Sequence, residues 1–107
     1  MKNLFKILCL SLFTFSFGQD CIDGVEVELW GECYNIEETT ELELSGSGLT
    51  GEIPSVIGNL TNLTSLYVYN NQLTGEIPSE IGQLTNLTYL NLYQNQLSGE
   101  IPSEIGN

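Results

Sequence analysis

The 107-residue sequence contains no histidine and only two basic residues, Lys2 and Lys6, against fourteen aspartates and glutamates. A serine or cysteine nucleophile needs a neighbouring base, and beyond residue 6 the sequence supplies neither histidine nor lysine. Metal sites built on imidazole ligands are excluded for the same reason. Nucleic acids and anionic membrane surfaces are excluded as partners, because a chain this acidic repels polyanions. Carboxylates are the catalytic groups that remain.

Long apolar runs are absent beyond the first eighteen residues. Lys2 and Lys6 precede an apolar run over residues 7–17, and Ser16-Phe17-Gly18 resembles the small-residue pattern that a signal peptidase reads. The run is shorter than the roughly 20 residues that a membrane-spanning helix needs. We therefore predict a cleaved signal peptide over residues 1–18 and a secreted or cell-surface, extracellular location. Loss of the two lysines changes the formal charge from −12 to −14.

Cysteine is also scarce, since only Cys21 and Cys33 follow the predicted signal peptide. In an exported chain, two cysteines twelve residues apart favour a single disulfide. A redox or metal pair is disfavoured, because no C-x-x-C motif, histidine or third thiol accompanies them. Between them, apolar residues alternate with glutamates as in a half-buried strand: Val25, Val27 and Leu29. Residues 19–38 are thus predicted to form an N-terminal cap.

The remainder of the sequence is repetitive. Residues 51–74 read GEIPSVIGNLTNLTSLYVYNNQLT and residues 75–98 read GEIPSEIGQLTNLTYLNLYQNQLS, with seventeen of twenty-four positions identical. A third copy opens at Gly99. A fixed period of this length is typical of a solenoid, in which each unit buries its apolar face against its neighbours.

Each unit combines a strand pattern with a turn. Leu66 and Val68 alternate with more polar residues, as in a half-buried strand whose other face is free. Asn71 and Asn95 follow the strands and form a predicted ladder, because a side-chain amide can bond the backbone groups of the turns. A Pro-Ser-Glu-Ile-Gly segment follows, which we expect Gly82 to end.

The spacing L-x-x-L-x-L-x-x-N-x-L-x-G-x-I-P resembles the leucine-rich repeat, and G-E-I-P in a 24-residue period resembles its plant-type class, found in plant receptor ectodomains and some bacterial surface proteins. The resemblance covers residues 39–107, although Thr39 and Ser47 replace a leucine and the asparagine in the first coil. It implies an α/β-type repeat solenoid, a right-handed coil with a short parallel β-sheet on its concave face. The N-terminal disulfide cap would precede about three and a third coils, the last incomplete, and further repeats would follow.

Variation between the two full copies indicates a binding face. They differ at seven positions, and three of these lie on or beside the outward side of the predicted strands: 65/89, 67/91 and 70/94. We predict that this concave side binds a protein, peptide or glycan through Ser65, Tyr67, Tyr69, Tyr89, Asn91 and Tyr93. The alternative is ordinary β-propensity, which also favours tyrosine on exposed strands. Glu41, Glu43 and Ser45 occupy the matching places in the first coil, so the face would change from acidic to aromatic.

Glu52, Glu76 and Glu100 recur at the repeat period and form a predicted glutamate ladder. Neighbouring carboxylates would lie about 4.8 Å apart, which is near the separation in retaining glycosidases. We expect no catalysis, because the ladder lies on the outer side rather than in a cleft and its members have like environments. Calcium bridging would make a stiffened structural or adhesive array, an alternative to the binding module, although no metal-site motif is present. No cofactor is expected.

Two further expectations concern processing and context. Asn59, Asn62 and Asn86 each begin an Asn-Leu-Thr triplet that matches the glycosylation acceptor pattern, although the triplets also belong to the repeat. The other alternative to a free binding module is the ectodomain of a membrane receptor of the kinase type, with its enzyme beyond Asn107. No segment after residue 18 is long and apolar enough to be expected to span a membrane.

Overall fold

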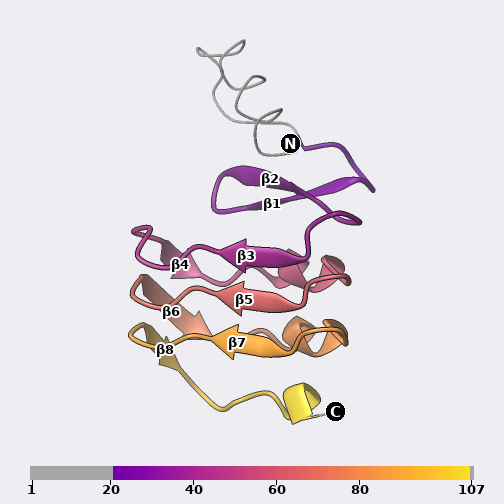
Figure 1. The fold of residues 1–107 in the computed structure, drawn as a ribbon. Helices are drawn as coiled ribbons and strands as arrows, with labels where there is room; N and C mark the ends of the chain where they lie inside the picture. The colour runs from indigo at the N-terminus through magenta and orange to yellow at the C-terminus, as the bar shows by residue number, and fades with distance from the viewer. Residues whose placement is uncertain (1–20, 107) are drawn as a thin grey trace.

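The computed structural model describes residues 21–106, so the predicted signal peptide lies outside the described residues. The fold is a cap hairpin followed by three stacked coils (Figure 1). Each coil contains two short strands and one 3-10 helix. Within residues 21–106, no helix is long and apolar enough to cross a lipid bilayer.

The predicted parallel sheet is present. It consists of β3 (Glu41–Glu43), β5 (Ser65–Tyr67) and β7 (Tyr89–Asn91), in that order. Leu42, Leu66 and Leu90 are partners across the three strands, and they point into the coil. Residues on either side of each leucine therefore point outward, because side chains alternate along a strand.

A second parallel sheet was not predicted. It contains β4 (Thr50–Glu52), β6 (Gln72–Glu76) and β8 (Gln96–Ser98). It forms a different side of the stack from the first sheet (Figure 1). β4 is exposed along its whole length, so it shows no apolar alternation. Gly51 and Gly75 have φ of 79° and 78°, in the left-handed region that favours glycine. Backbone pairing between coils, rather than side-chain pattern, defines this sheet.

The Pro-Ser segments form the helices η1 (Ser55–Asn59), η2 (Ser79–Gln83) and η3 (Ser103–Gly106). Pro54 and Pro78 precede η1 and η2 with φ of −67° and −68°, the angle to which the proline ring restricts the chain. The prediction that Gly82 ends its segment was wrong, because η2 continues to Gln83. The N–H of Leu84 then donates to the Ile81 carbonyl and closes the turn.

The core runs along the axis of the stack. Its fully enclosed members come from the helices, the turns and both sheets of the first two coils: Ile57, Leu60, Leu63, Leu66, Leu73 and Leu29 of the cap, all 0% exposed. Corresponding residues of the third coil are only partly buried: Leu87, Leu90, Leu92 and Leu97. Burial therefore depends on having a neighbour on both sides, as in other solenoids.

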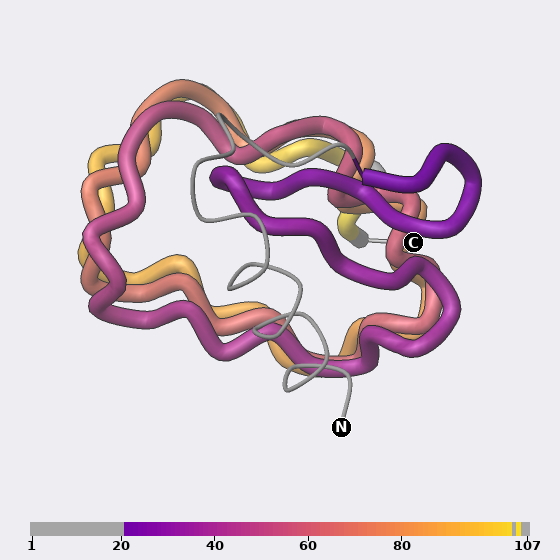
Figure 2. The backbone as a smooth tube through the Cα atoms, turned by 90° about the horizontal axis from the view of Figure 1, so that it is seen from above, coloured from indigo at the N-terminus to yellow at the C-terminus, as the bar shows by residue number. Residues whose placement is uncertain are grey.

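The cap is a two-stranded antiparallel hairpin of β1 (Glu26–Leu29) and β2 (Glu32–Asn35). It lies across the open end of the first coil (Figure 2). Val27 and Leu29 are buried, and β1 packs against η1. Val25, expected on the same buried face, is 44% exposed because it precedes the strand. The disulfide between Cys21 and Cys33 joins the entry segment to β2.

Asn71 and Asn95 tie the coils together at the ends of the first sheet. Asn71 is 8% exposed, and its Oδ1 accepts hydrogen bonds from the backbone N–H groups of Ser47 and Leu49, both at 3.0 Å. Asn95 repeats the pattern one coil further, where its Oδ1 accepts from the N–H of Leu73 at 3.0 Å. The amide ladder therefore satisfies turn N–H groups that would otherwise lack a partner.

Candidate functional site

The outward side of the β3–β5–β7 sheet, here called the tyrosine face, is built from rows that cross the three coils. The first row contains Glu41, Ser65 and Tyr89, and the second contains Glu43, Tyr67 and Asn91. Neighbouring strands in a sheet lie about 4.8 Å apart, so each side chain lies beside its row partners. The structure thus brings four of the predicted binding residues, Ser65, Tyr67, Tyr89 and Asn91, into one surface. Tyr69 follows just after β5.

Two tyrosines of this face contact each other. The rings of Tyr67 and Tyr89 are stacked, with centroids 6.5 Å apart and planes inclined by 28°. They belong to different rows, so the contact is diagonal across β5 and β7. Leu66 and Leu90 pack in the core next to them and fix the backbone from which the rings project. The pair forms a flat aromatic surface with polar hydroxyl tips.

Tyr69 and Tyr93 extend the tyrosine face beyond the strand ends. The N–H of Asn70 donates to the Tyr93 carbonyl at 2.9 Å, which continues the pairing between the second and third coils. Tyr93 is 69% exposed and Tyr89 is 63% exposed, whereas Tyr67 and Tyr69 are half-buried. Asn70 has a φ of 59°, which lies in the left-handed region, so the chain turns out of the strand direction directly after Tyr69.

Asn91 has a role in the turn as well as on the surface. Its Oδ1 accepts a hydrogen bond from the N–H of Tyr93 at 3.0 Å, which holds the backbone of the most exposed tyrosine. Glu43 does the same in the first coil, where its Oε1 accepts from the N–H of Ser45 at 3.0 Å. Sequence reasoning treated Asn91 only as a contact residue. The sequence does contain a signal for this role: an asparagine side chain can accept a hydrogen bond from the backbone N–H two residues further on, where the chain turns.

The charged side chains of the tyrosine face are all negative among the described residues. Glu41 and Glu43 are exposed at its first-coil end, and residues 21–106 contain no lysine, arginine or histidine to pair with them. Beside them, Ser65 and Tyr67 are half-buried, and the third coil presents exposed tyrosines. The surface therefore changes from anionic to aromatic across three strands.

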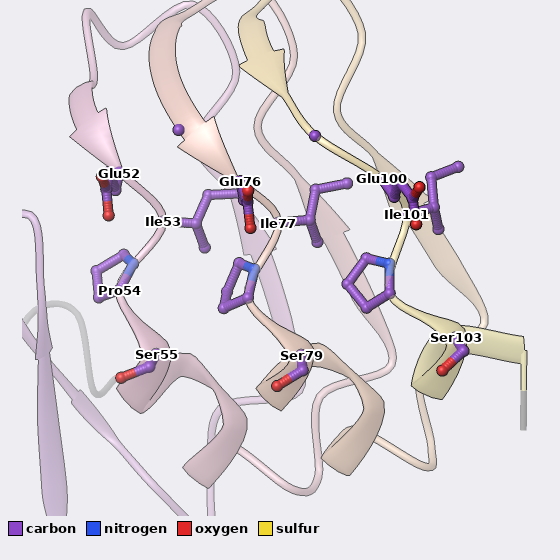
Figure 3. Close-up of a pocket in the computed structure, with 14 residues that line it drawn as sticks. Glu52, Ile53, Pro54, Ser55, Glu76, Ile77, Ser79, Glu100, Ile101 and Ser103 are labelled. Carbon is purple, nitrogen blue, oxygen red and sulfur yellow. The ribbon is translucent and has the colours of Figure 1, made fainter.

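The glutamate ladder lies on another side of the molecule and requires a correction. It was expected away from any cleft, but Glu52, Glu76 and Glu100 line a hollow of about 1040 Å³ that follows the Glu-Ile-Pro-Ser segments of three coils (Figure 3). The side chains of Glu52 and Glu76 each cover a glycine of the following coil, Gly75 and Gly99: a β-carbon on either glycine would lie 2.8 Å from the glutamate Cγ. The hollow repeats one arrangement three times, so it does not offer an acid and a base in unlike environments.

The metal-ligating possibilities are limited. Among residues 21–106, the group of three or more ligand atoms within 4.8 Å of one another is Cys21, Glu26 and Cys33. Both sulfurs of this group are joined in the disulfide, so neither is a thiolate available to a metal. The three ladder glutamates do not converge in this way within the described residues.

The three Asn-Leu-Thr triplets differ in their surroundings. Asn62 Nδ2 donates to the Glu37 carbonyl at 2.9 Å, and Asn86 Nδ2 donates to the Thr61 carbonyl at 3.0 Å. Both amides therefore tie their coil to the preceding chain. Asn59 is exposed at the end of η1 and has no side-chain hydrogen bond to residues 21–106.

These repeats match known family models over most of the described chain. A model for Leucine Rich repeats (2 copies) matches residues 61–104, and a model for a single Leucine Rich Repeat matches residues 38–60. The chain belongs to the leucine-rich repeat family. A comparison with curated proteins found no match.

Solved leucine-rich-repeat structures resemble this chain closely. A chain of the BIR3–SERK2 complex from Arabidopsis thaliana is 40% identical with a TM-score of 0.62, over 64% of this chain and 37% of that one. A chain of the Arabidopsis receptor kinase HAESA, in complex with the peptide hormone IDA and the co-receptor SERK1, is 45% identical with a TM-score of 0.60, over 62% and 11%. A TDR receptor structure is 52% identical with a TM-score of 0.54, over 55% and 10%. This leucine-rich-repeat chain therefore covers well under half the length of each relative and shares the plant-type class.

Proposed function

We propose that this protein is an extracellular leucine-rich-repeat module that binds a protein, peptide or glycan through the tyrosine face and catalyses no reaction. The observation that carries the proposal is the stack of Tyr67 and Tyr89 on the open face of the first sheet, with Tyr69 and Tyr93 just beyond the ends of β5 and β7. Tyrosine combines a large apolar ring with a polar tip and freezes few torsions on binding, which suits it to recognition surfaces.

The relatives support a protein or peptide over a glycan. Two of them were solved as complexes: BIR3 with SERK2, and the receptor kinase HAESA with the peptide hormone IDA and the co-receptor SERK1. The identity of 40% or more shows more than a shared fold, although this chain covers only part of those receptors. A rigid stack with a variable outward face suits the same kind of recognition here.

The test is a selection of random linear peptides displayed on phage against the immobilised full chain, followed by affinity measurements with synthetic copies of the selected peptides. The double change Tyr69→Ala and Tyr93→Ala should weaken binding by at least about thirtyfold, because the loss of even one aromatic anchor buried by the ligand costs roughly 2 kcal/mol. Val56→Ala, an exposed apolar truncation on η1, is the matched control and should leave affinity unchanged. Equal affinities for the tyrosine variant and the parent would refute this face as the binding site.

A second candidate is that the module forms part of a receptor ectodomain. The similarity to the receptor kinase HAESA and to a TDR receptor favours it. Reading the gene beyond the codon for Asn107 tests this directly. An apolar span of roughly 20 residues followed by kinase motifs would establish it, and an open frame with further repeats but no such span would remove it.

A further inference from the structure

The charges of the tyrosine face restrict what can bind there. Glu41 and Glu43 are both exposed on β3, and the buried residue between them, Leu42, fixes their outward direction. Residues 21–106 supply no cationic side chain, so a carboxylate here has no ionic partner from the described chain. A bound anion would meet repulsion without any compensating pair.

An aromatic surface that prefers cations adjoins these carboxylates. Glu43 is the register partner of Tyr67, whose ring stacks on Tyr89 at a centroid distance of 6.5 Å. The face of an aromatic ring attracts a cation, and an arginine guanidinium can stack on a ring while it pairs with a carboxylate. Strand spacing of about 4.8 Å places the carboxylate and the ring within reach of one guanidinium group.

We propose that the tyrosine face takes an extended basic peptide, with an arginine or lysine paired with Glu41 and Glu43 over the first coil and less polar residues lying across the tyrosines. This inference rests on the proposed function and names the chemistry of its ligand. Charge complementarity selects the occupant, because a neutral glycan could stack on the rings but would leave both carboxylates without a partner. A peptide end with a free carboxylate finds no arginine or lysine to bind among residues 21–106.

The carboxylates can be neutralised without disturbing the sheet. Glu43 Oε1 accepts the N–H of Ser45, and the amide oxygen of a glutamine can accept the same bond. Glu41 makes no side-chain hydrogen bond within residues 21–106. The double change Glu41→Gln and Glu43→Gln therefore isolates charge from structure. The double change Glu76→Gln and Glu100→Gln removes the same number of charges from the glutamate ladder and serves as the matched control.

The experiment uses the phage-displayed random linear peptides on the full chain and asks what residues the selected peptides share. Enrichment in arginine or lysine is expected, together with an affinity at least about tenfold lower for the Glu41→Gln and Glu43→Gln variant and unchanged for the ladder control. Added NaCl should weaken binding to the parent more than to the variant, because salt screens exposed charges.

Other outcomes separate this inference from the proposed function. Peptides that lose affinity on Tyr69→Ala and Tyr93→Ala but contain no excess of basic residues would overturn the basic-ligand inference and leave the binding face standing. Peptides insensitive to both the tyrosine and the glutamate changes would overturn both proposals. Equal losses in the glutamate variant and the ladder control would overturn the inference, because net charge rather than Glu41 and Glu43 would then govern binding.

Discussion

The side-chain amides of Asn71 and Asn95 both donate to the carbonyl oxygen of Val68, each at 2.9 Å. Asn71 belongs to the same coil as Val68, whereas Asn95 belongs to the next coil. One acceptor therefore closes a turn within its own coil and also joins that coil to its neighbour. A carbonyl oxygen has two lone pairs, so it can accept both bonds.

The two asparagines should differ in their effect on stability. Asn71→Ala leaves the partly buried N–H groups of Ser47 and Leu49 without their acceptor and removes a buried amide, and should lower the free energy of unfolding by about 3 kcal/mol. Asn95→Ala should cost about 1–2 kcal/mol, because Asn95 is only half-buried and the Val68 carbonyl keeps its bond from Asn71.

Urea unfolding of the purified chain measures both costs. Gln72→Ala is the control, because this exposed amide makes no side-chain hydrogen bond within residues 21–106 and should change stability by less than about 0.5 kcal/mol. Equal costs for Asn71→Ala and Asn95→Ala would mean that burial does not set the strength of the ladder.

The sequence predicted the parts of the fold that follow from a local side-chain pattern, and it did not predict those that follow from backbone pairing between coils. The first sheet was predicted because Leu66 and Val68 must be buried on one side of a strand, which is a local pattern. The second sheet was not, because β4 is exposed at all its residues and exists through backbone pairing with β6, twenty-two residues further along. The helix end at Gln83 was missed because Gly82 remains helical there instead of adopting a left-handed conformation.

The candidate site shows the same division. The tyrosines could be assigned to one face because strand alternation and the repeat period place them there. Their ring stacking could not, because the contact between Tyr67 and Tyr89 runs diagonally between rows and depends on rotamers. The hollow beside Glu52 and Glu76 also required coordinates, since it forms between stacked segments that are a full repeat apart.

Gly58 should tolerate no side chain, although its helix would favour one. A β-carbon there would lie 2.7 Å from the Glu80 carbonyl oxygen and 2.7 Å from Gln83 Oε1, both on η2 of the next coil. Alanine has a higher helix propensity than glycine, so a local effect would stabilise the variant. Because backbone cannot move aside cheaply, we expect Gly58→Ala to lower the free energy of unfolding by about 1–3 kcal/mol.

Thermal or urea unfolding measures this loss of stability. A double variant then shows which of the two contacts causes it. Combining Gly58→Ala with Gln83→Ala removes the contact with the flexible side chain but keeps the one with the Glu80 carbonyl. Most of the cost should therefore remain in the double variant. A neutral or stabilising Gly58→Ala would show that η1 and η2 can separate without loss of packing.

Tyr34 should make the cap sensitive to alkaline pH. Burial, and secondarily the negative charge of Glu32, raise the pKa of the Tyr34 hydroxyl above its usual value of 10.0. The folded protein then holds this proton more tightly than the unfolded chain does. Its contribution to stability is complete below pH 10.0 and is lost as the pH rises through the folded-state pKa.

Urea unfolding at pH 9 and pH 11, on the order of one unit either side of the usual tyrosine value, measures this loss. We expect the free energy of unfolding to fall between the two conditions in the parent and to fall less in Tyr34→Phe, which has no hydroxyl to ionise. Glu32→Gln removes the secondary cause and should give an intermediate slope. Identical slopes in the parent and Tyr34→Phe would contradict the assignment.

The disulfide between Cys21 and Cys33 should hold the cap on the stack. It closes a loop with a sequence separation of 12, which contains β1, and a cross-link of this size contributes about 3 kcal/mol. A two-stranded hairpin is marginally stable alone, so the cap depends on this bond and on the packing of Val27 and Leu29. Reduction by dithiothreitol should therefore lower the melting temperature of the parent. Cys21→Ser with Cys33→Ala should melt at the lowered temperature with or without reductant.

Amide hydrogen exchange then locates the loss. If the bond acts through the cap, reduction should speed exchange first in β1 and β2, while the N–H groups held by Asn71 and Asn95 keep their protection. Uniform acceleration along all three coils would show instead that cap and coils unfold as one cooperative unit. Unchanged melting on reduction would mean that the packing of Leu29 and Val27 against the first coil holds the hairpin without the cross-link.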